Sequence, residues 1–578
     1  MNFQVLYKTS TDENSAEQTK RIKKLFTWFL ILLLVIAHVA ISLAQTNVNN
    51  TFQAKSEFVP VIKESTKFSD LPEIKDTVKR ITNTKYGIVS NPLFPKYQVQ
   101  NIDAAKMQNE PLTKLYRSLL KIGYGPIYNS PYGEFFISNL RSRDVSFGAH
   151  LKHYSSSSTL DKTGYAGFSD DIATIYGKKF YKKHTLSGDL NYTRNEVHYY
   201  GYDPSINIIT DKNFTKQRYQ LIEPKLVLQS HYTDSSKANH TIQAGFYNLQ
   251  NLYREAENNI NLKADADLFV NKEKLNIGFS TDYYNHKQSH DTLNDLIVSV
   301  APSFEAHGKK WKGLVGVKGT LDNFKGKNRF YGYPQLNFEY NVYESMFIPY
   351  TGVTGGLIKN SLRSLSSENP FIDTSINYTN TNNRYKLFGG IKGNLSSKTS
   401  YDIKGSYSQM DSLYFYVLNY SGLNQMYNQF NVVYDNATVM NLSGQLKYQL
   451  KEKIHFIAKG NYYMYKTKSL TRAYHKPDYD ITFSTIYNLR SKIILRADIY
   501  AIGKQWTQTQ IITDGKAELT PKELNGLIDV NLEAEYRYTK MLSFFTRFNN
   551  IANQRYYRWE RYPTQRFNFT VGLSFVPF

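Results

Sequence analysis

The chain has 578 residues, no cysteine and a formal net charge of +22 at pH 7. The absence of cysteine excludes a disulfide framework, thiol chemistry and a lipid-modified N-terminal cysteine. The basic residues are spread along the chain without a nucleic-acid-binding motif, so we expect no nucleic-acid partner; the positive field favours anionic neighbours such as lipopolysaccharide phosphates.

The first segment has the pattern of an export signal. Arg21, Lys23 and Lys24 precede residues 25–44, a largely apolar run without Lys, Arg, Asp or Glu that ends in small residues before Gln45. We therefore expect 1–44 to be a signal peptide. A single membrane anchor is the alternative, because the run is long enough to span a bilayer.

Residues 45–118 predict a short extended segment that lies in the periplasm or fills a lumen. Spaced prolines, among them Pro60, Pro72 and Pro92, interrupt its short apolar clusters. Its roughly 70 residues are fewer than the about 100 that a globular plug with its own core would need.

From residue 119 onward, apolar and polar residues alternate with a period of two, which indicates strands with one apolar face. The alternation is clearest over 260–270, 442–450, 493–501 and 528–538. A charged face inside a barrel needs water, so we expect the apolar face to meet lipid and the charged face to line a wet lumen. The candidates for the lumen-facing set are Asp265, Asp267, Arg496, Asp498, Glu533, Glu535 and Arg537.

Short and long connections alternate along this region. Short turns, many of them rich in Lys, are expected near residues 143, 183, 235, 272, 309, 344, 397, 451, 490 and 540. Ten such turns predict an all-β fold, a transmembrane antiparallel β-barrel of about 22 strands over 119–578, with both ends in the periplasm. A barrel of this width would leak, so the N-terminal segment, inward-folded loops such as 505–526, or a partner protein should fill it.

The last strand ends the chain on an aromatic residue. Phe569, Val571, Leu573 and Phe575 share one face, and Phe578 follows an irregularity at Val576 and Pro577. This pattern looks like the signal by which the barrel assembly machinery of the outer membrane recognises its substrates.

The final hairpin resembles that of TonB-dependent receptors. The resemblance rests on residues 548–557 (FNNIANQRYY), Tyr562-Pro563, Arg566 and the closing 572–575 (GLSF). The Tyr- and Lys-rich composition is similar to that of Bacteroidetes envelope proteins. The resemblance implies a location in the outer membrane and passage or binding of solutes. The missing plug and the lack of a TonB box argue against TonB-driven uptake.

Catalytic, cofactor and metal motifs are not evident, so we do not expect an enzyme. His286, His290, Asp291 and Asp295 could bind a cation but are interpreted as a solvated polar loop. The aromatic clusters 199–202 and 556–559 could stack on sugars or lipid headgroups, and are interpreted as interface girdles. The alternative to a solute channel is a structural barrel that anchors another envelope protein.

The topology predicts which connections are exposed on the cell. An epitope inserted in 505–526 should be labelled on intact cells, and one inserted at 451–452 should be labelled only after permeabilisation, because short turns face the periplasm. Surface labelling at 451–452 would reverse the orientation.

Overall fold

The computed structural model describes residues 116–577, except 141, 206–208, 210, 271–272, 289–290, 374–375, 421–425, 451–452 and 515. The predicted signal peptide, nearly all of the N-terminal segment and Phe578 lie outside the described residues.

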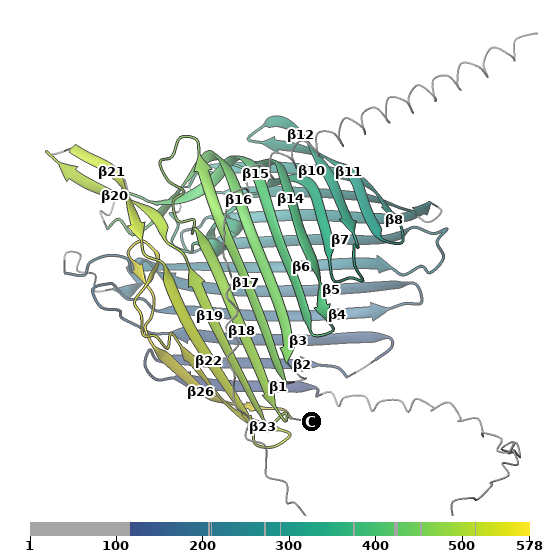
Figure 1. The fold of residues 1–578 in the computed structure, drawn as a ribbon. Helices are drawn as coiled ribbons and strands as arrows, with labels where there is room; N and C mark the ends of the chain where they lie inside the picture. Colours follow the sequence, from purple (N-terminus) through teal and green to yellow (C-terminus); the bar gives the residue numbers. More distant parts are fainter. Residues whose placement is uncertain are drawn as a thin grey trace, which may run out of the picture. The chain divides into compact units, whose positions relative to one another are not determined.

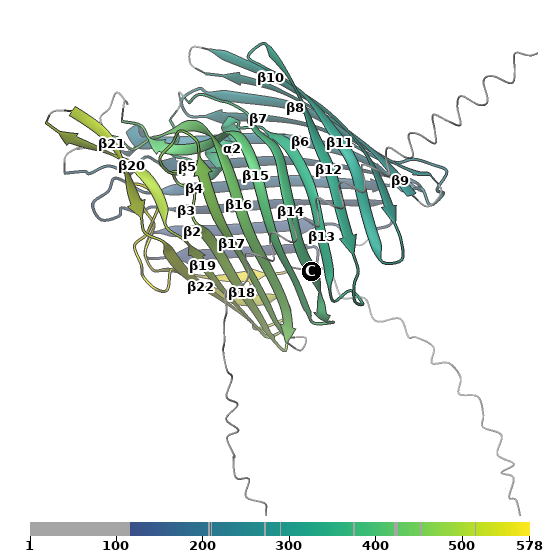
Figure 2. The same ribbon diagram turned by 45° about the horizontal axis from the view of Figure 1, so that its top comes forward.

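The chain forms a closed antiparallel barrel of 22 strands, which confirms the predicted fold and strand number (Figures 1 and 2). The first strand pairs with the last, from Leu120 opposite Phe575 to Tyr124 opposite Val571, so the sheet has no free edge. The barrel strands are β1 (Ser118–Gly125), β2 (Ser130–Ser138), β3 (Val145–Ser156), β4 (Phe168–Phe180), β5 (His184–His198), β6 (Lys216–Ser230), β7 (Asn239–Asn251), β8 (Ala256–Val270), β9 (Glu273–Lys287), β10 (Thr292–His307), β11 (Trp311–Phe324), β12 (Lys327–Tyr340), β13 (Ile348–Ile358), β14 (Thr381–Ser396), β15 (Thr399–Leu418), β16 (Phe430–Leu450), β17 (Ile454–Thr467), β18 (Tyr479–Leu489), β19 (Ile493–Ile502), β22 (Leu527–Arg537), β23 (Leu542–Asn549) and β26 (Asn568–Phe575).

The two ends of the barrel differ in their connections. At one end, the turn end, the chain reverses after β2, β4, β6, β8, β10, β12, β14, β16, β18 and β22, at the positions predicted for the short turns. The other end, the loop end, carries the long connections. β15 and β16 have 20 and 21 residues, whereas a tilted strand needs about 9–11 to cross a bilayer. Long strands therefore extend the wall beyond that span.

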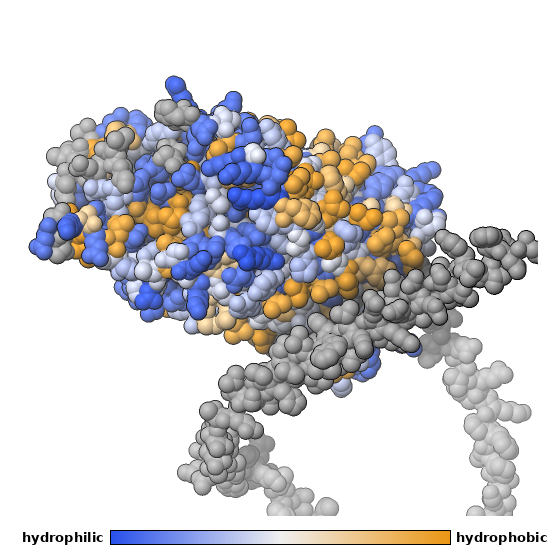
Figure 3. Space-filling model, turned by 90° about the horizontal axis from the view of Figure 1, so that it is seen from above, coloured by the Kyte–Doolittle hydropathy of each residue, from blue (hydrophilic) through white to orange (hydrophobic). Residues whose placement is uncertain are grey.

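The outer face of the barrel is apolar. Neighbouring strands align their exposed apolar side chains across the ladder, as where Leu573 lies opposite both Ile122 and Phe544. Val315 and Leu226 are about three-fifths exposed, at 61% and 59%. Figure 3 shows one face of the molecule, on which apolar side chains gather in a broad area bordered by polar ones. Such a surface is stable against lipid and not against water.

Few elements lie outside the barrel wall. They are the 3-10 helix η1 (Lys212–Thr215), the short helix α2 (Leu362–Glu368) between β13 and β14, and two hairpins, β20 (Gln505–Thr513) with β21 (Lys516–Leu524) and β24 (Tyr557–Trp559) with β25 (Tyr562–Pro563). No helix in the described part of the chain has both the length and the hydropathy for crossing a membrane.

The expectation that loop 505–526 folds inward was wrong for most of its length. Its β20–β21 hairpin projects away from the barrel (Figure 1), and Ile512 near the tip is 73% exposed. The two strands pair with each other from Gln505 opposite Leu524 onward, so their backbone groups are satisfied without the lumen. Only the base, where Gln505 and Thr507 are buried, packs against other loops.

Substitutions in the middle of β22 test which of its two faces meets lipid. Leu532→Arg should destabilise the assembled barrel by about 2–4 kcal/mol, because Leu532 is exposed on the apolar face at mid-strand. Glu533→Gln should be tolerated, since glutamine can still accept from Arg547, which lies 3.3 Å away. Heat-modifiability on a gel measures both, and the reverse ranking would invert the assignment of faces.

Candidate functional site

Three loop segments pack together at the loop end of the barrel. We call residues 199–202, the described residues of 359–380, and 557–563 the loop cap. Their apolar side chains share one buried cluster with the upper wall, and each large buried side chain contributes about 1.5–3 kcal/mol. The cap supplies Tyr199, Leu362, Leu365, Phe371, Ile372, Ile376, Tyr378, Trp559 and Tyr562, and the wall supplies Val197, Tyr219, Tyr247, Leu249, Phe324, Tyr416, Leu418, Phe430 and Val432.

Aromatic rings hold the three segments to one another. Phe371 stacks on Tyr562 with ring centroids 3.8 Å apart, and Tyr200 meets both rings edge-on. Trp559 packs edge-on against Tyr416 of β15 at 5.1 Å. The interpretation of these aromatic clusters as interface girdles was wrong for Tyr199 and Trp559, which are buried in the cap and not exposed to lipid.

Tyrosine hydroxyls satisfy the backbone of the irregular loop 359–380. Tyr199 donates to the carbonyl of Ile372 at 3.0 Å, and Tyr219 of β6 donates to the carbonyl of Pro370 at 3.1 Å. Tyr416 of β15 donates to the carbonyl of Leu365 at 3.0 Å. A buried loop without regular structure is stable only when such groups find partners. The wall therefore supplies hydrogen-bond donors at the positions where the backbone of this loop needs them.

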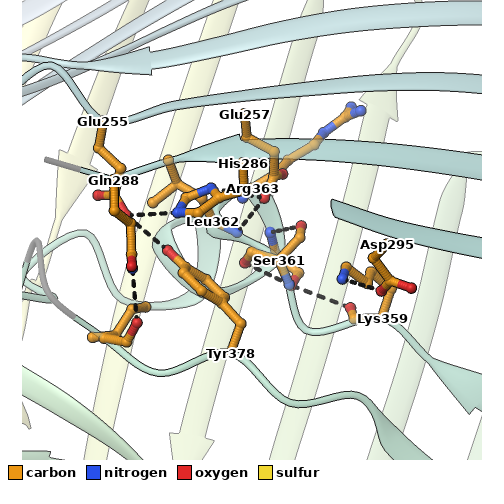
Figure 4. A network of polar contacts seen from close by, with 12 residues as sticks. Glu255, Glu257, His286, Gln288, Asp295, Lys359, Ser361, Leu362, Arg363 and Tyr378 are labelled. Atoms are coloured by element: carbon orange, nitrogen blue, oxygen red, sulfur yellow. Dashed lines mark hydrogen bonds and ion pairs between the residues drawn. The ribbon is translucent and has the colours of Figure 1, made fainter. Parts of the chain in front are cut away.

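Figure 4 shows a polar network that anchors α2 to the wall. Glu257 of β8 accepts from the backbone N–H of Leu362 at 2.8 Å and from the hydroxyl of Tyr247 at 2.7 Å. His286 of β9 lies between two carboxylates, 3.0 Å from Glu255 and 3.6 Å from Glu257. Glu257 thereby satisfies an N–H group at the start of α2 that has no partner within the helix.

Tyr378 joins this network from the far end of loop 359–380. Its hydroxyl donates to Glu255 at 3.0 Å (Figure 4). Burial raises the pKa of the Tyr378 hydroxyl well above its usual range, and the charges of Glu255 and Glu257 add to this. The hydroxyl therefore remains a protonated donor at any physiological pH.

A second anchor is the guanidinium of Arg363. It forms two parallel hydrogen bonds with Glu223 of β6, at 2.9 and 2.8 Å, and lies over the ring of Tyr247. Partial burial acts to lower the pKa of Arg363, but the hydrogen bonds and charge of Glu223 outweigh it and raise the pKa. Paired bonds of this kind fix orientation as well as distance.

A third anchor ties both stems of the loop to β10 and β11. The Lys359 ammonium contacts the carboxylate of Asp295, and the amide of Asn380 donates to Asp295 and to Asp322 at 3.0 Å each. Asp295 and Asp322 are almost fully buried. Buried carboxylates are costly unless paired, so these contacts favour the closed position of the loop.

The loop after β17 extends the contact to the end of α2. Lys476 forms an ion pair with Glu368 at 3.1 Å and lies 4.0 Å above the ring of Tyr414. Burial lowers the pKa of His475 to about 3, so this imidazole stays neutral between the rings of Trp559 and Phe430. The Lys476 ammonium is thus paired with a carboxylate, and the guanidinium of Arg558 donates to Gln505 at 2.8 Å.

A pocket of about 560 Å³ lies beside the cap, against the wall formed by β3 to β5, β22, β23 and β26. Phe371 and Tyr200 of the cap form one side of it. Asparagine, glutamine and aspartate side chains form much of the rest, and the lining contains neither Lys nor Arg. Its volume lies within the about 300–1,000 Å³ of small-molecule sites.

The predicted lumen-facing residues are distributed over three strands. Asp265 and Asp267 lie on the same face of β8 as Glu257, and Asp267 pairs with Lys274 at 2.9 Å. On β19, Asp498 accepts from Ser484 at 2.5 Å, and Arg496 lies opposite Glu533.

On β22, Glu533 pairs with Arg547 at 3.3 Å and Glu535 with Arg537 at 3.1 Å. None of these predicted residues belongs to the cap anchors. Their role as a wet inner wall stays a prediction.

The predicted assembly signal lies on the closing strand. Phe569, Val571, Leu573 and Phe575 alternate along β26, which ends at Phe575. The backbone N–H of Val576 donates to the carbonyl of Met541, so the chain stays attached to the wall just past the strand. Its recognition by the assembly machinery stays a prediction.

The interpretation of His286 and Asp295 as parts of a solvated loop was wrong. Both are buried, and each bonds to a residue of loop 359–380 or to one of its carboxylate partners. Only Asp291 of that group is exposed among its described members. The one available signal was charge at strand ends, where His286 and Asp295 flank a short connection. No group of three or more potential His, Cys, Asp or Glu metal ligands occurs within the described ranges.

Neither a protein-family model nor a curated protein matches this sequence. Solved structures do match. The siderophore receptor PirA from Acinetobacter baumannii superposes with a TM-score of 0.60 at 10% identity, over 81% of each chain. The chain has the fold of an outer-membrane receptor barrel.

Two further structures share this architecture. The pyoverdine outer membrane receptor FpvA from Pseudomonas aeruginosa PAO1 gives a TM-score of 0.60 at 10% identity, over 81% of this chain and 79% of FpvA. The FrpB iron transporter from Neisseria meningitidis gives 0.62 at 9% identity, over 80% and 82%. The likeness to the receptor barrels predicted from the last hairpin is thus confirmed for the fold. These three proteins are described as receptors or a transporter, not as enzymes.

Removing one wall anchor should loosen the cap and leave the barrel intact. Glu257→Ala leaves the Leu362 N–H and the Tyr247 hydroxyl without their acceptor, at about 1–3 kcal/mol each. Brief trypsin treatment should then cut after Arg363 at least tenfold faster, as measured by mass spectrometry. Glu305→Ala, which removes an ion pair with Lys312 near the turn end, is the control. Equal cutting in both variants would show that Glu257 does not hold the loop.

Proposed function

We propose that this protein is an outer-membrane barrel that passes small solutes across the outer membrane, with the loop cap as its outer gate. The observation that carries the proposal is a packed set of loops at the loop end that buried contacts hold to the wall. Long loops with their own buried contacts are commonly functional lids.

The chemistry of the cap suits a gate that opens without unfolding the barrel. Loop 359–380 enters and leaves the wall at Ile358 and Thr381, so its displacement breaks no pairing between barrel strands and only the isolated bridge of Ile372 with Phe430 of β16. The anchors of Arg363 and Lys359 exchange carboxylate partners for water when the loop moves out, which offsets part of their loss. The apolar cluster supplies the opposing preference for the closed state.

The apolar outer face and the receptor-barrel fold support a location in the outer membrane. We expect lipid, including lipopolysaccharide, and the barrel assembly machinery as neighbours, and we treat TonB as a doubtful partner. The limits of the domains, with a signal at 1–44, a periplasmic or lumen-filling segment at 45–118 and the barrel at 119–578, belong to the same proposal.

One observation favours a second function, that of a barrel that anchors another envelope protein. The β20–β21 hairpin extends from the loop end (Figure 1) and exposes Ile511, Ile512 and Leu519 together with charged residues. An exposed hairpin with apolar side chains is a surface for a partner. This function needs no passage through the lumen.

Planar-bilayer conductance tests the proposed gate. Residues 362–373 are replaced by a short Gly-Ser linker, which removes α2 and the aromatic contacts of Phe371. The purified variant should show a several-fold larger conductance than the unaltered protein, because the mouth has lost its cover. A parallel chain lacking 46–108 measures how far the N-terminal segment closes the lumen.

The pattern of results separates the two functions. A rise with the linker variant supports the gate, whether or not the deletion adds to it. A rise with the deletion alone would place the closure in the N-terminal segment and overturn the gate. Unchanged conductance in both, and in the two changes combined, would favour the anchoring barrel.

A further inference from the structure

The pocket beside the cap has a composition that selects among solutes. Asn531 of β22 and Asn549 of β23 line it, with Asp529, Asn195 and Asp170 close by, and Phe371 of the cap forms part of its roof. These residues come from both ends of the barrel sequence, because β26 closes against β1. The pocket exists only in the closed barrel.

Three polar side chains of the lining each use one polar atom in a hydrogen bond within the protein and leave another polar atom without a hydrogen-bond partner among the described residues. The side-chain amide of Asn549 donates to the side-chain oxygen of Asn568 at 2.8 Å. The side-chain oxygen of Asn531 accepts from the backbone N–H of Asn550 at 3.0 Å. Among the described residues, no hydrogen bond involves the Asn531 amino group or the Asn549 oxygen. One carboxylate oxygen of Asp529 is buried without a partner, while the other accepts from Tyr556 at 2.7 Å.

This arrangement presents donors and acceptors side by side. A carboxamide offers both, and a hydroxyl group on a ligand requires both. The Asn531 amino group and the Asn549 side-chain oxygen supply one donor and one acceptor for such a hydroxyl. The polar wall of the pocket thus matches several neighbouring hydroxyl groups.

The charge of the lining excludes other ligands. It contains two carboxylates, Asp170 and Asp529, and no Lys or Arg, so an anion would be repelled. Each carboxylate already accepts from a neighbour, Asn195 or Tyr556, which reduces its attraction for a cation. A neutral ligand meets neither penalty.

Aromatic rings supply flat apolar surfaces on the other sides. Tyr154 and Phe168 meet edge-on at 5.4 Å on the wall, and Tyr200 and Phe371 meet edge-on at 5.8 Å in the cap. A ligand with both hydroxyl edges and apolar ring faces would use both kinds of surface.

We infer that this pocket binds an uncharged, polyhydroxylated ligand of the size of a mono- or disaccharide. The inference rests on the proposed function, since it names the class of solute that enters the gated lumen. The ligand contacts the cap directly through Phe371 and Tyr200.

Binding is measured by saturation-transfer difference NMR on the purified full-length mature protein in detergent. This method detects weak binding and does not depend on transport. The probes are maltose and sucrose as neutral sugars, glucuronate as an anion and glucosamine as a cation. The neutral sugars should give transfer signals, and the double variant Asn531→Ala/Asn549→Ala should weaken their binding at least tenfold. Asn276→Ala on β9, which removes one amide bond to Asp267 elsewhere, is the matched control and should bind as the unaltered protein does.

Three results would overturn the inference. They are the absence of transfer to any neutral sugar, stronger binding of glucuronate or glucosamine, and unchanged binding in the double variant. Heat-modifiability confirms that each variant is folded, and Asp529→Asn serves as a second probe of the same wall if the double variant does not assemble. Binding is measured separately from conductance, so a failed inference leaves the gate standing, and a failed gate leaves the binding result standing.

Discussion

Backbone hydrogen bonding in a medium without water is the constraint on which this structure depends. Inside a bilayer, an unpaired N–H or C=O group costs several kcal/mol, so a sheet that crosses it must close. Here closure is the pairing of β1 with β26, from Leu120 opposite Phe575 to Tyr124 opposite Val571. The first and last parts of the barrel sequence therefore become neighbours, and both contribute to the pocket beside the cap.

Closure also decides where a hydrophobic core can form. Most outer side chains are apolar because lipid surrounds them. A small buried cluster lies where the loop after β17 covers β15 and β16; it contains Leu413, Phe415, Val417, Ala437, Val439 and Tyr474. The larger packed core lies at the loop end, where Tyr219, Tyr416 and Phe430 of the wall meet Leu362, Leu365 and Trp559 of the loop cap. Those wall residues lie on β6, β15 and β16, and the last two strands are the longest in the barrel. The parts of β15 and β16 that extend beyond the bilayer thus supply wall residues against which the cap packs.

The sequence predicted the barrel well because its signals are local. Alternation along a strand and the spacing of short turns depend only on neighbouring residues, and they yielded the 22 strands and the positions of the turns. The cap depends on contacts between residues far apart in the chain. Glu257 and Leu362 are separated by 105 positions, and Tyr199 and Ile372 by 173. Neither pairing has a pattern in the sequence.

The same difference explains two of the wrong expectations at the loop end. Loop 505–526 is long, but its own residues pair as a hairpin, so it does not need the lumen. His286 and Asp295 belong to polar strand ends that look solvated, until loop 359–380 covers them. Loop length and local polarity do not show which loop folds inward. What decides it is whether the wall offers partners for the loop backbone, as the hydroxyls of Tyr219 and Tyr416 do.

The position of the pocket limits how tightly it can bind if the cap is a gate. Phe371 belongs both to the pocket lining and to the stack with Tyr562 that holds the cap together. A ligand that gains free energy from Phe371 in the closed state stabilises that state by the same amount. Tight binding would therefore hold the gate shut. Amide hydrogen bonds, each worth about 0.5–1.5 kcal/mol net of water, suit a site that must both select its ligand and release it.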